Sequence, residues 1–384
     1  MEQKQWGVYV HIPFCRQKCF YCDFPSFAGR ERYMKEYIRA LCQEIEVRGS
    51  SYVRRWGNPA TIYIGGGTPS ALPAALMEQL LLAIGNVFCI AGEEVEFTVE
   101  CNPGTVDAAY LAMMHAHGVN RLSFGVQSFD DELLRRIGRI HTGEQAVQAA
   151  VMARAVGFSN ISIDLMYGLP GQSMAELKAG VEQALSLQPA HISIYGLQLE
   201  EGTAFARLQE MGKLDLPTDE DTEAMYDYMT EVLPANGYER YEISNFARPG
   251  FASRHNLSYW QDLPYLGLGA AAHSYLEGQR WEAETEIPAY IDLIKSGQSP
   301  FKLEEPATRA IAMEEFAFLA LRTTAGISRQ RFEQKFGCSF DSVYQQAVQR
   351  LCDKGFLVDD GDAVYLTKLG MKYGNWAFEE FLLF

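Results

Sequence analysis

The residues with the clearest chemical potential are three cysteines near the start of the chain. Cys15, Cys19 and Cys22 form a CxxxCxxC run directly after a short apolar stretch. Thiolates are the soft ligands that iron–sulfur clusters need. Three thiolates on one loop can bind three corners of a cubane cluster and leave one iron without a protein ligand, as in catalytic metal sites that keep an open position. The spacing therefore predicts a [4Fe-4S] cluster with one open iron.

A zinc site is the alternative for these cysteines. Structural zinc takes four ligands, and the candidates for a fourth are His11, Cys42, Cys89 and Cys101. None of them stands at a usual zinc spacing, so the run favours the cluster. The chain has eight cysteines in all. In a reducing compartment such a set indicates metal or redox chemistry and not a disulfide framework.

Polar residues that could bind a ligand gather where predicted strands end. Gly66, Gly67 and Thr68 follow one strand, and glycines allow backbone groups to approach a ligand closely. Glu100 and Asp164 end two further strands. Alone, the glycines could form a simple tight turn and the carboxylates could cap the next turn. In barrels, however, the carboxyl ends of the strands build the active site, so we expect these positions to converge.

Alternating strands and helices are expected to position these residues. The six strand candidates are Gly7–His11, Thr61–Ile64, Val95–Glu100, Arg121–Gly125, Ile161–Asp164 and His191–Tyr195. Amphipathic helical stretches lie between them, which predicts parallel strands with right-handed crossovers. The predicted fold class is therefore α/β, with a partial TIM-like (β/α)6 barrel; closure to eight units is the alternative.

Three parts of the chain are distinguished by these patterns. The strand–helix alternation covers residues 1–236, which we assign to the barrel. Residues 237–305 are expected to form the connection between the barrel and the C-terminal part of the chain. Within them, Arg254–His273 is rich in glycine and aromatic residues. Residues 306–384 show three helical stretches and then a β-hairpin around Asp360, an order that resembles a winged helix. We expect a small C-terminal α+β domain with a packing role.

The charge balance excludes some partners. The chain has 33 basic and 49 acidic residues, a net charge of −16, whereas nucleic-acid binding is dominated by Lys and Arg contacts to phosphate. From Pro306 onward nine Lys or Arg stand against ten Asp or Glu, which is no basic recognition surface. The first residues lack a secretory pattern and no stretch is apolar enough to span a bilayer. We expect a cytoplasmic protein that does not bind nucleic acid.

The cysteine run and its surroundings resemble a known family. CxxxCxxC is the radical S-adenosylmethionine (SAM) signature, and the run Tyr9–Cys15 (YVHIPFC) resembles oxygen-independent coproporphyrinogen oxidases and their HemW heme chaperone relatives. The resemblance extends nearly end to end. It implies that the open iron binds the amino and carboxylate groups of SAM. It also implies that an electron, supplied by a donor such as flavodoxin or ferredoxin, can cleave SAM to methionine and a 5′-deoxyadenosyl radical.

The same resemblance implies which residues bind SAM. The glycine-rich turn matches the motif for the SAM amino group, Asp164 a residue that binds ribose hydroxyls, and Arg139 a partner for a SAM carboxylate. The full set is Tyr9, Tyr21, Gly66, Gly67, Thr68, Glu100, Gln127, Arg139 and Asp164. From the residues alone, Tyr9 and Tyr21 fit core aromatics equally well, and Arg139 fits a solvated helix charge.

Two features favour one branch of the family. The resemblance implies a fourth cysteine in the oxidases at a position where this chain has Phe24. Residues His255–Trp260 match the HNxxYW motif of the HemW family. These features imply a chaperone that carries heme to acceptor hemoproteins, including membrane-bound respiratory enzymes, with a peripheral position at the membrane during transfer. The alternatives are the oxidase itself and a HemN-like radical SAM methyltransferase.

His255 is the candidate heme ligand within the HNxxYW motif. An imidazole is a good axial ligand for heme iron, and Tyr259 and Trp260 could pack against the macrocycle. From the residues alone, a loop whose aromatics fill the core and whose histidine is merely hydrogen-bonded is favoured, and the resemblance reverses this preference. His273 is a second candidate. The chain has no CxxCH motif, so heme binding is expected to be non-covalent or reversibly covalent.

Overall fold

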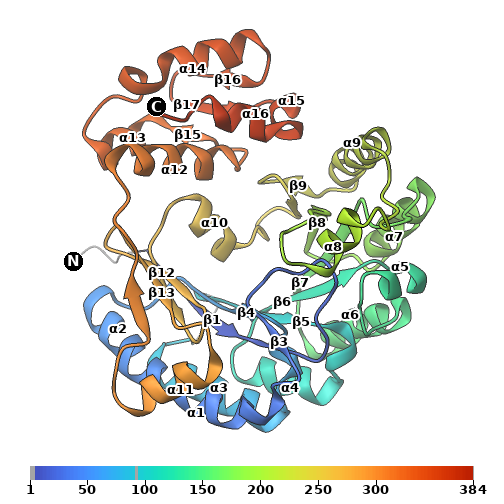
Figure 1. Ribbon diagram of the computed structural model, residues 1–384, viewed down its shortest axis with the longest axis vertical. Helices are drawn as coiled ribbons and strands as arrows, with labels where there is room; N and C mark the ends of the chain where they lie inside the picture. The colour runs from blue at the N-terminus through green and yellow to red at the C-terminus, as the bar shows by residue number, and fades with distance from the viewer. Residues whose placement is uncertain (1–4, 91–93, 384) are drawn as a thin grey trace.

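One large, curved sheet organises most of the molecule (Figure 1). The computed structural model describes residues 5–90 and 94–383. Within them the sheet has 12 strands, in the order β14-β13-β12-β11-β1-β4-β5-β6-β7-β8-β10-β9. Its parallel centre contains β1 (Gly7–Ile12), β4 (Thr61–Gly66), β5 (Glu96–Cys101), β6 (Arg121–Gln127), β7 (Asn160–Tyr167) and β8 (His191–Gly196). These are the six predicted strands, which confirms the predicted α/β fold.

The sheet stays open, because the two strands at its edges do not pair with each other in the described part of the chain. The edges are built from short strands: β9 (Glu239–Arg240), β10 (Asn245–Ala247), β11 (Tyr265–Leu268), β12 (His273–Leu276), β13 (Gln279–Ala283) and β14 (Phe301–Leu303). Of these, β11 runs parallel to β1, while β10 runs antiparallel to β8. The barrel is therefore partial and not closed to eight units.

The segment Arg254–His273 contains more regular structure than a connection. It forms helix α10 (Arg254–Trp260) and then strand β11 beside β1. Both elements are short, and β11 carries a glycine at position 267, so neither has the sustained periodicity by which longer elements are predicted. The sequence therefore missed a seventh parallel strand and the helical conformation of the HNxxYW motif.

Helices cover the convex side of the sheet, whereas α10 lies on its inner side (Figure 1). The helices before α10 are α1 (Met34–Glu44), α2 (Ser50–Trp56), α3 (Ala74–Val87), α4 (Ala108–Ala116), α5 (Asp131–Arg136), α6 (Gly143–Val156), α7 (Met174–Ser186), α8 (Ala204–Glu210) and α9 (Asp219–Ala235). Capping boxes begin α6 at Thr142, α7 at Ser173 and α9 at Thr218. The helix α11 (Ile287–Lys295) packs against α1 from the other edge.

Strand β6 shows how the sheet separates two environments. Leu122, Phe124 and Val126 are fully buried in the apolar core. Alternate residues of a strand point to opposite faces, and Arg121 and Ser123 accordingly line a cavity on the inner face. The helices thus pack on an apolar face, and the interior of the partial barrel is polar.

The last part of the chain has its own apolar core. Its elements are α12 (Arg309–Leu321), β15 (Ile327–Ser328), α13 (Arg329–Phe336), α14 (Asp341–Asp353), β16 (Leu357–Asp359), β17 (Ala363–Leu366), α15 (Lys368–Lys372) and α16 (Gly374–Glu379). The sheet order β15-β17-β16 and the preceding helices agree with the predicted winged-helix-like α+β domain. Phe332 and Val364 are fully buried in a cluster separate from that of the sheet.

Polar contacts join this C-terminal part to both sides of the open sheet. Lys335 on α13 forms an ion pair with Asp262, just after α10. Lys372 on α15 forms an ion pair with Asp227 on α9, with a nitrogen–oxygen distance of 2.8 Å. The small domain therefore contacts two separate parts of the barrel, the segment before β11 and the helix α9 that precedes the edge strand β9. Among residues 5–90 and 94–383, no helix has the length and apolar character needed to cross a bilayer.

Candidate functional site

The loop that carries the three cysteines is fastened at its base. Cys15 ends the short strand β2 (Phe14–Cys15), which pairs in parallel with β3 (Phe27–Ala28). Within the loop, the Lys18 ammonium donates to the Phe24 carbonyl at 3.0 Å. The loop therefore holds the cysteines beside the sheet through local backbone and side-chain bonds.

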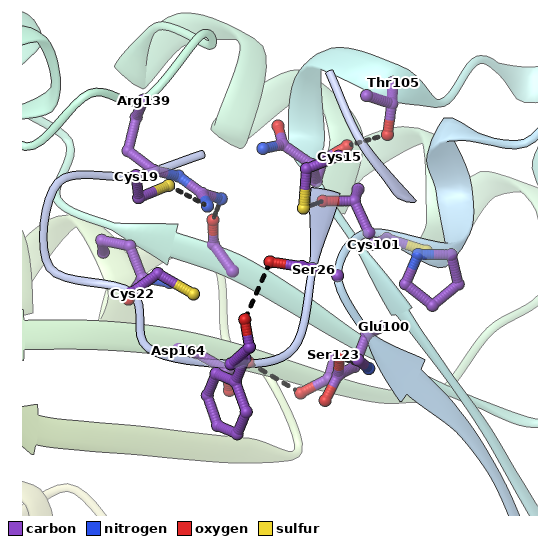
Figure 2. Close-up of a pocket in the computed structure, with 18 of the residues that line it drawn as sticks. Cys15, Cys19, Cys22, Ser26, Glu100, Cys101, Thr105, Ser123, Arg139 and Asp164 are labelled. Carbon is purple, nitrogen blue, oxygen red and sulfur yellow. Dashed lines mark hydrogen bonds between the residues drawn. The ribbon is translucent and has the colours of Figure 1, made fainter. Parts of the chain in front are cut away.

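A cavity of about 410 Å³ lies between this loop and the sheet. Figure 2 shows the labelled cysteines on the loop, with Glu100, Ser123 and Asp164 on the strands behind it. All three cysteines are free of disulfides. The predicted residues that line the cavity are Cys15, Cys19, Cys22, Tyr21, Gly66, Gly67, Thr68, Glu100, Gln127, Arg139 and Asp164. The structure therefore brings together residues that lie far apart in the sequence.

The cysteine sulfurs do not converge on a single point. Among the residues that the structure describes, no three His, Cys, Asp or Glu side chains are grouped so that they could hold one metal ion. A cubane cluster attaches each thiolate to a different iron, so its thiolates need not converge on one point. Burial raises the pKa of the Cys15 and Cys22 thiols, so binding of a metal must release their protons.

Two donors stand beside the cysteine sulfurs. The Thr68 hydroxyl lies 3.6 Å from the Cys15 sulfur, and the Arg139 guanidinium lies 3.6 Å from the Cys19 sulfur. Arg139 also donates to the Gly125 carbonyl. Both donors are placed to hydrogen-bond the cysteine sulfurs. Arg139, which could have been a solvated charge, is thus part of the cavity wall.

The glycine-rich turn packs closely against the cysteine strand. The amide of Gly67 donates to the Ile12 carbonyl at 2.9 Å, and the amide of Thr68 donates to the Phe14 carbonyl at 2.8 Å. A Cβ atom on Gly67 would lie only 2.8 Å from the Phe14 carbonyl oxygen and 3.0 Å from the Cys15 sulfur. Glycine is therefore required here by the close approach of the two loops, whatever ligand enters the cavity.

The two carboxylates predicted at strand ends are held by neutral donors. Glu100 accepts from the Tyr63 hydroxyl at 2.7 Å and from the Gly66 amide at 3.2 Å. Burial raises the pKa of Glu100 to about 7. Asp164 accepts from the hydroxyls of Ser123 and Ser162, each at 2.8 Å. Both carboxylates are thereby oriented, and Glu100 exchanges its proton near neutral pH.

Gln127 ends β6 in an unusual backbone conformation. Its φ is +68°, in the left-handed region, and the register with β7 shifts between Gly125 and Gln127. Such a φ costs free energy for a residue other than glycine, and such residues concentrate at functional positions. The irregularity directs the end of β6 into the cavity wall, where Gln127 lies.

Tyr9 is the one predicted SAM residue that does not line the cavity. It lies on β1, half-buried, and its hydroxyl is 2.9 Å from Nδ1 of His11. Its ring stacks on that of Tyr63, with a centroid distance of 6.3 Å. Through Tyr63, which donates to Glu100, Tyr9 supports the cavity wall from behind. This placement agrees with the aromatic core role left open by the sequence.

His255 also lies outside the cavity, at the opposite end of the strands. Only 1% of its surface is exposed. Its Nδ1 is 2.7 Å from the Thr61 hydroxyl, its Nε2 is 2.9 Å from the Tyr259 hydroxyl, and its ring stacks on Tyr63 at 4.9 Å. Burial, followed by the charge of Arg121, lowers the pKa of His255 to about 3. In this conformation the ring is neutral and both of its nitrogens are bonded.

The helix α10 begins where two strands begin. Its first amides, those of Arg254 and His255, donate to the two carboxylate oxygens of Glu96 at 3.0 and 2.9 Å. Glu96 is the first residue of β5, and Thr61 is the first residue of β4. The helix therefore closes the end of the partial barrel that lies opposite the cysteine loop.

Several cavity residues were missed by the sequence analysis. They include Arg121, Ser193, Tyr195 and Asn256. In β6 the alternation of Arg121 with Ser123, Gly125 and Gln127 was visible in the sequence, but it was not used to identify the inward face. Asn256 lies in the HNxxYW motif, and the structure turns this residue, not His255, toward the cavity.

Comparisons with known proteins agree with this geometry. Residues 9–184 match the radical SAM superfamily, and residues 307–372 match the HemN C-terminal domain. The chain is 41% identical to the heme chaperone HemW of Bacillus subtilis (strain 168), over 98% of this chain and 99% of that protein. It is 39% identical to the heme chaperone HemW of Lactococcus lactis, over 100% of this chain and 99% of that protein.

A solved structure shares the fold. The coproporphyrinogen III oxidase HemN from Escherichia coli, described as a radical SAM enzyme, matches 99% of this chain and 90% of its own chain with a TM-score of 0.84. The sequence identity is 23%, so this likeness establishes the architecture alone.

Proposed function

The chain belongs to the HemW heme chaperone family of the radical SAM superfamily, and on this premise we propose that it binds heme and transfers it to acceptor hemoproteins. One observation carries the choice between the branches. At the position where the oxidases are expected to have a fourth cysteine, this chain has Phe24, whose side chain lies at the cavity wall and is 63% exposed. A heme carrier needs an apolar contact surface for a macrocycle, and Phe24 supplies one.

The proposal includes a [4Fe-4S] cluster on Cys15, Cys19 and Cys22 and SAM in the adjoining cavity. When bound, such a cluster supplies an electron to SAM, and we expect the electron to come from a flavodoxin or ferredoxin. Asp164 is oriented by Ser123 and Ser162 to accept from the ribose hydroxyls, while Arg139 provides a charge for the carboxylate. These roles are supported by the shared cavity, to which Tyr9 contributes only through Tyr63.

Two histidines are proposed as contacts for heme iron, and the structure makes different demands on them. His255 can bind iron through Nε2 only if this atom first loses its bond to Tyr259. His273, on β12, has a side chain that is 53% exposed, and its Nδ1 lies 3.2 Å from Glu304. His273 can therefore meet heme without rearrangement of the core, whereas ligation by His255 requires α10 to shift.

Transfer of heme to the acceptor is expected in the cytoplasm, with peripheral contact to the membrane when the acceptor lies there.

Anaerobic purification and three assays test the proposed function. Hemin titration should give a Soret band of bound heme, and incubation with an apo-hemoprotein should move that heme to the acceptor. Reduced, SAM-loaded protein should leave coproporphyrinogen III unconsumed. Turnover to protoporphyrinogen together with absent heme transfer would replace the chaperone by the oxidase.

A further inference from the structure

Arg121 is a buried cation without a partner. It is the first residue of β6, and only 1% of its surface is exposed. Its Nε is among the buried polar atoms that have no hydrogen bond. In the described residues its guanidinium forms neither a hydrogen bond nor an ion pair. A buried charge costs free energy unless it is paired. Binding of an anion beside the guanidinium would therefore stabilise this arrangement.

The guanidinium lies at the floor of the cavity that the cysteine loop covers. Arg121 and Gln127, the first and last residues of β6, both line this cavity. At about 3.3 Å per residue, the six steps between them span about 20 Å. The cavity therefore continues well below the strand ends where the predicted SAM residues gather. Asn256 of α10 lines it as well and lies next to His255, which is bonded at the starts of the strands.

The carboxylates of the cavity are bonded to other groups and form no ion pair with Arg121, although its charge acts on Glu100 to lower the pKa of that carboxyl. Glu100 is bonded to Tyr63 and Gly66, and its pKa is raised to about 7 by burial, so it carries only part of a charge at neutral pH. Asp164 is bonded to two serine hydroxyls. The nearby imidazoles do not compete for an anion, because burial and then the charge of Arg121 lower the pKa of His191 and His255.

We propose that Arg121 binds a carboxylate group of a ligand that occupies the cavity. A guanidinium is planar and donates two parallel hydrogen bonds to a carboxylate, which makes this anion its best match. Two sources of the carboxylate fit the cavity. One is a propionate of heme, which rests on the proposed function. The other is the carboxylate of SAM, which the proposed function assigns to Arg139 at the strand ends; binding of this group by Arg121 would replace that assignment. Asn256 would donate an amide N–H to the same ligand from α10.

Matched ligand pairs identify the carboxylate. Binding is measured anaerobically on cluster-loaded full-length protein for SAM against decarboxylated SAM, and for hemin against hemin dimethyl ester. The wild type should prefer the carboxylate-bearing member of one pair by about tenfold or more, the size of a hydrogen bond to a charged group. Arg121→Gln should lose most of this preference, and Arg121→Lys should keep part of it. Arg16→Gln is the control, because Arg16 also lines the cavity but is exposed.

The ligand pair whose preference is lost in Arg121→Gln identifies the molecule that supplies the carboxylate. A response in the SAM pair assigns the SAM carboxylate, and it remains informative if heme binding, and with it the proposed function, fails. A wild type without preference in either pair, or a preference unchanged in Arg121→Gln, would overturn the proposal.

A stability measurement separates binding from a structural role. An unpaired buried cation destabilises the unliganded protein, so Arg121→Met should raise or preserve the Tm of the protein without SAM and heme. The same substitution should abolish the part of the ligand-induced rise in Tm that depends on the carboxylate. If Arg121 served the fold alone, Arg121→Met would lower the Tm while the carboxylate-dependent rise persisted.

Discussion

The two ends of the partial barrel differ in how their polar side chains are used. At the end under the cysteine loop, cysteines, carboxylates and Arg139 face a cavity, and Gln127 adopts a positive φ. At the other end, α10 fills the opening, and both nitrogens of His255 have partners. Most groups with unused bonding capacity therefore lie at the first end and most packing at the second, with Arg121 at the start of β6 as an unpaired exception. The difference indicates that chemistry belongs under the loop and that α10 supports it from below.

Removing the thiols tests the first end most strongly. The triple variant with Cys15, Cys19 and Cys22 changed to Ala should lose all cluster iron, about four atoms per chain in the reconstituted wild type, the content of a cubane. Iron analysis and electron paramagnetic resonance measure this loss. Full zinc occupancy of the native protein with no uptake of iron would reverse the assignment.

Removing the anchor of α10 tests the second end. Glu96→Ala leaves the amides of Arg254 and His255 without their charged acceptor, and this should lower the free energy of unfolding by about 3 kcal/mol. Urea unfolding gives the value, and the exposed Glu94→Ala is the control. Cluster iron per folded chain should stay at the wild-type level; a cluster lost in Glu96→Ala would show that the two ends do not act separately.

Substitution of His255 and of His273 tests whether either histidine binds heme iron. His255→Ala removes two hydrogen bonds and a ring stack, so it should cost about 2 kcal/mol of stability. If His255 also binds the iron, its folded variant should show a shifted Soret band. His273→Ala should leave stability unchanged, because its side chain is 53% exposed. Wild-type heme spectra in both variants would exclude these histidines as ligands.

SAM binding should respond to changes of Asp164 and Arg139 at the first end. Asp164→Asn and Arg139→Gln should each weaken SAM binding by about tenfold, because each removes one charge-assisted bond. Equilibrium dialysis on cluster-loaded protein measures the affinity, with iron content as the check on the site. Unchanged affinity in both variants would remove these residues from the proposed SAM site.

A pH dependence of stability is expected from Glu100. Burial raises its folded pKa from 4.5 to about 7, so the folded state holds a proton that the unfolded state releases. This contribution to stability is complete below pH 4.5 and is lost as the pH rises through 7. Glu100→Gln should therefore flatten the fall in Tm between pH 5 and 8 in protein without cluster. A fall as steep as that of the wild type would assign the effect to another group.

Long, regular elements were predictable from the sequence. The six parallel strands and the C-terminal helices have clear periodicity, and strand ends with glycine or carboxylate converged as expected for a barrel. Tyr9 was harder, because a β1 tyrosine can face the cavity or a neighbouring ring. The orientation of His255 depends on a seven-residue helix, too short for a periodic pattern. Arg121 was overlooked because a charge at a strand start normally reaches solvent.

The bridge made by the C-terminal domain has a mechanical consequence. Lys335 pairs with Asp262 on one side of the open sheet, and Lys372 pairs with Asp227 on the other, so the domain spans the width of the barrel (Figure 1). A closed barrel fixes its diameter by hydrogen bonds around the whole circle. Here the C-terminal domain is joined to the barrel by these ion pairs, which salt screens, and by a backbone bond from the Thr324 amide to the Tyr241 carbonyl. High ionic strength should therefore weaken the two ion pairs of the domain, while its backbone contact with the segment before β10 stays formed.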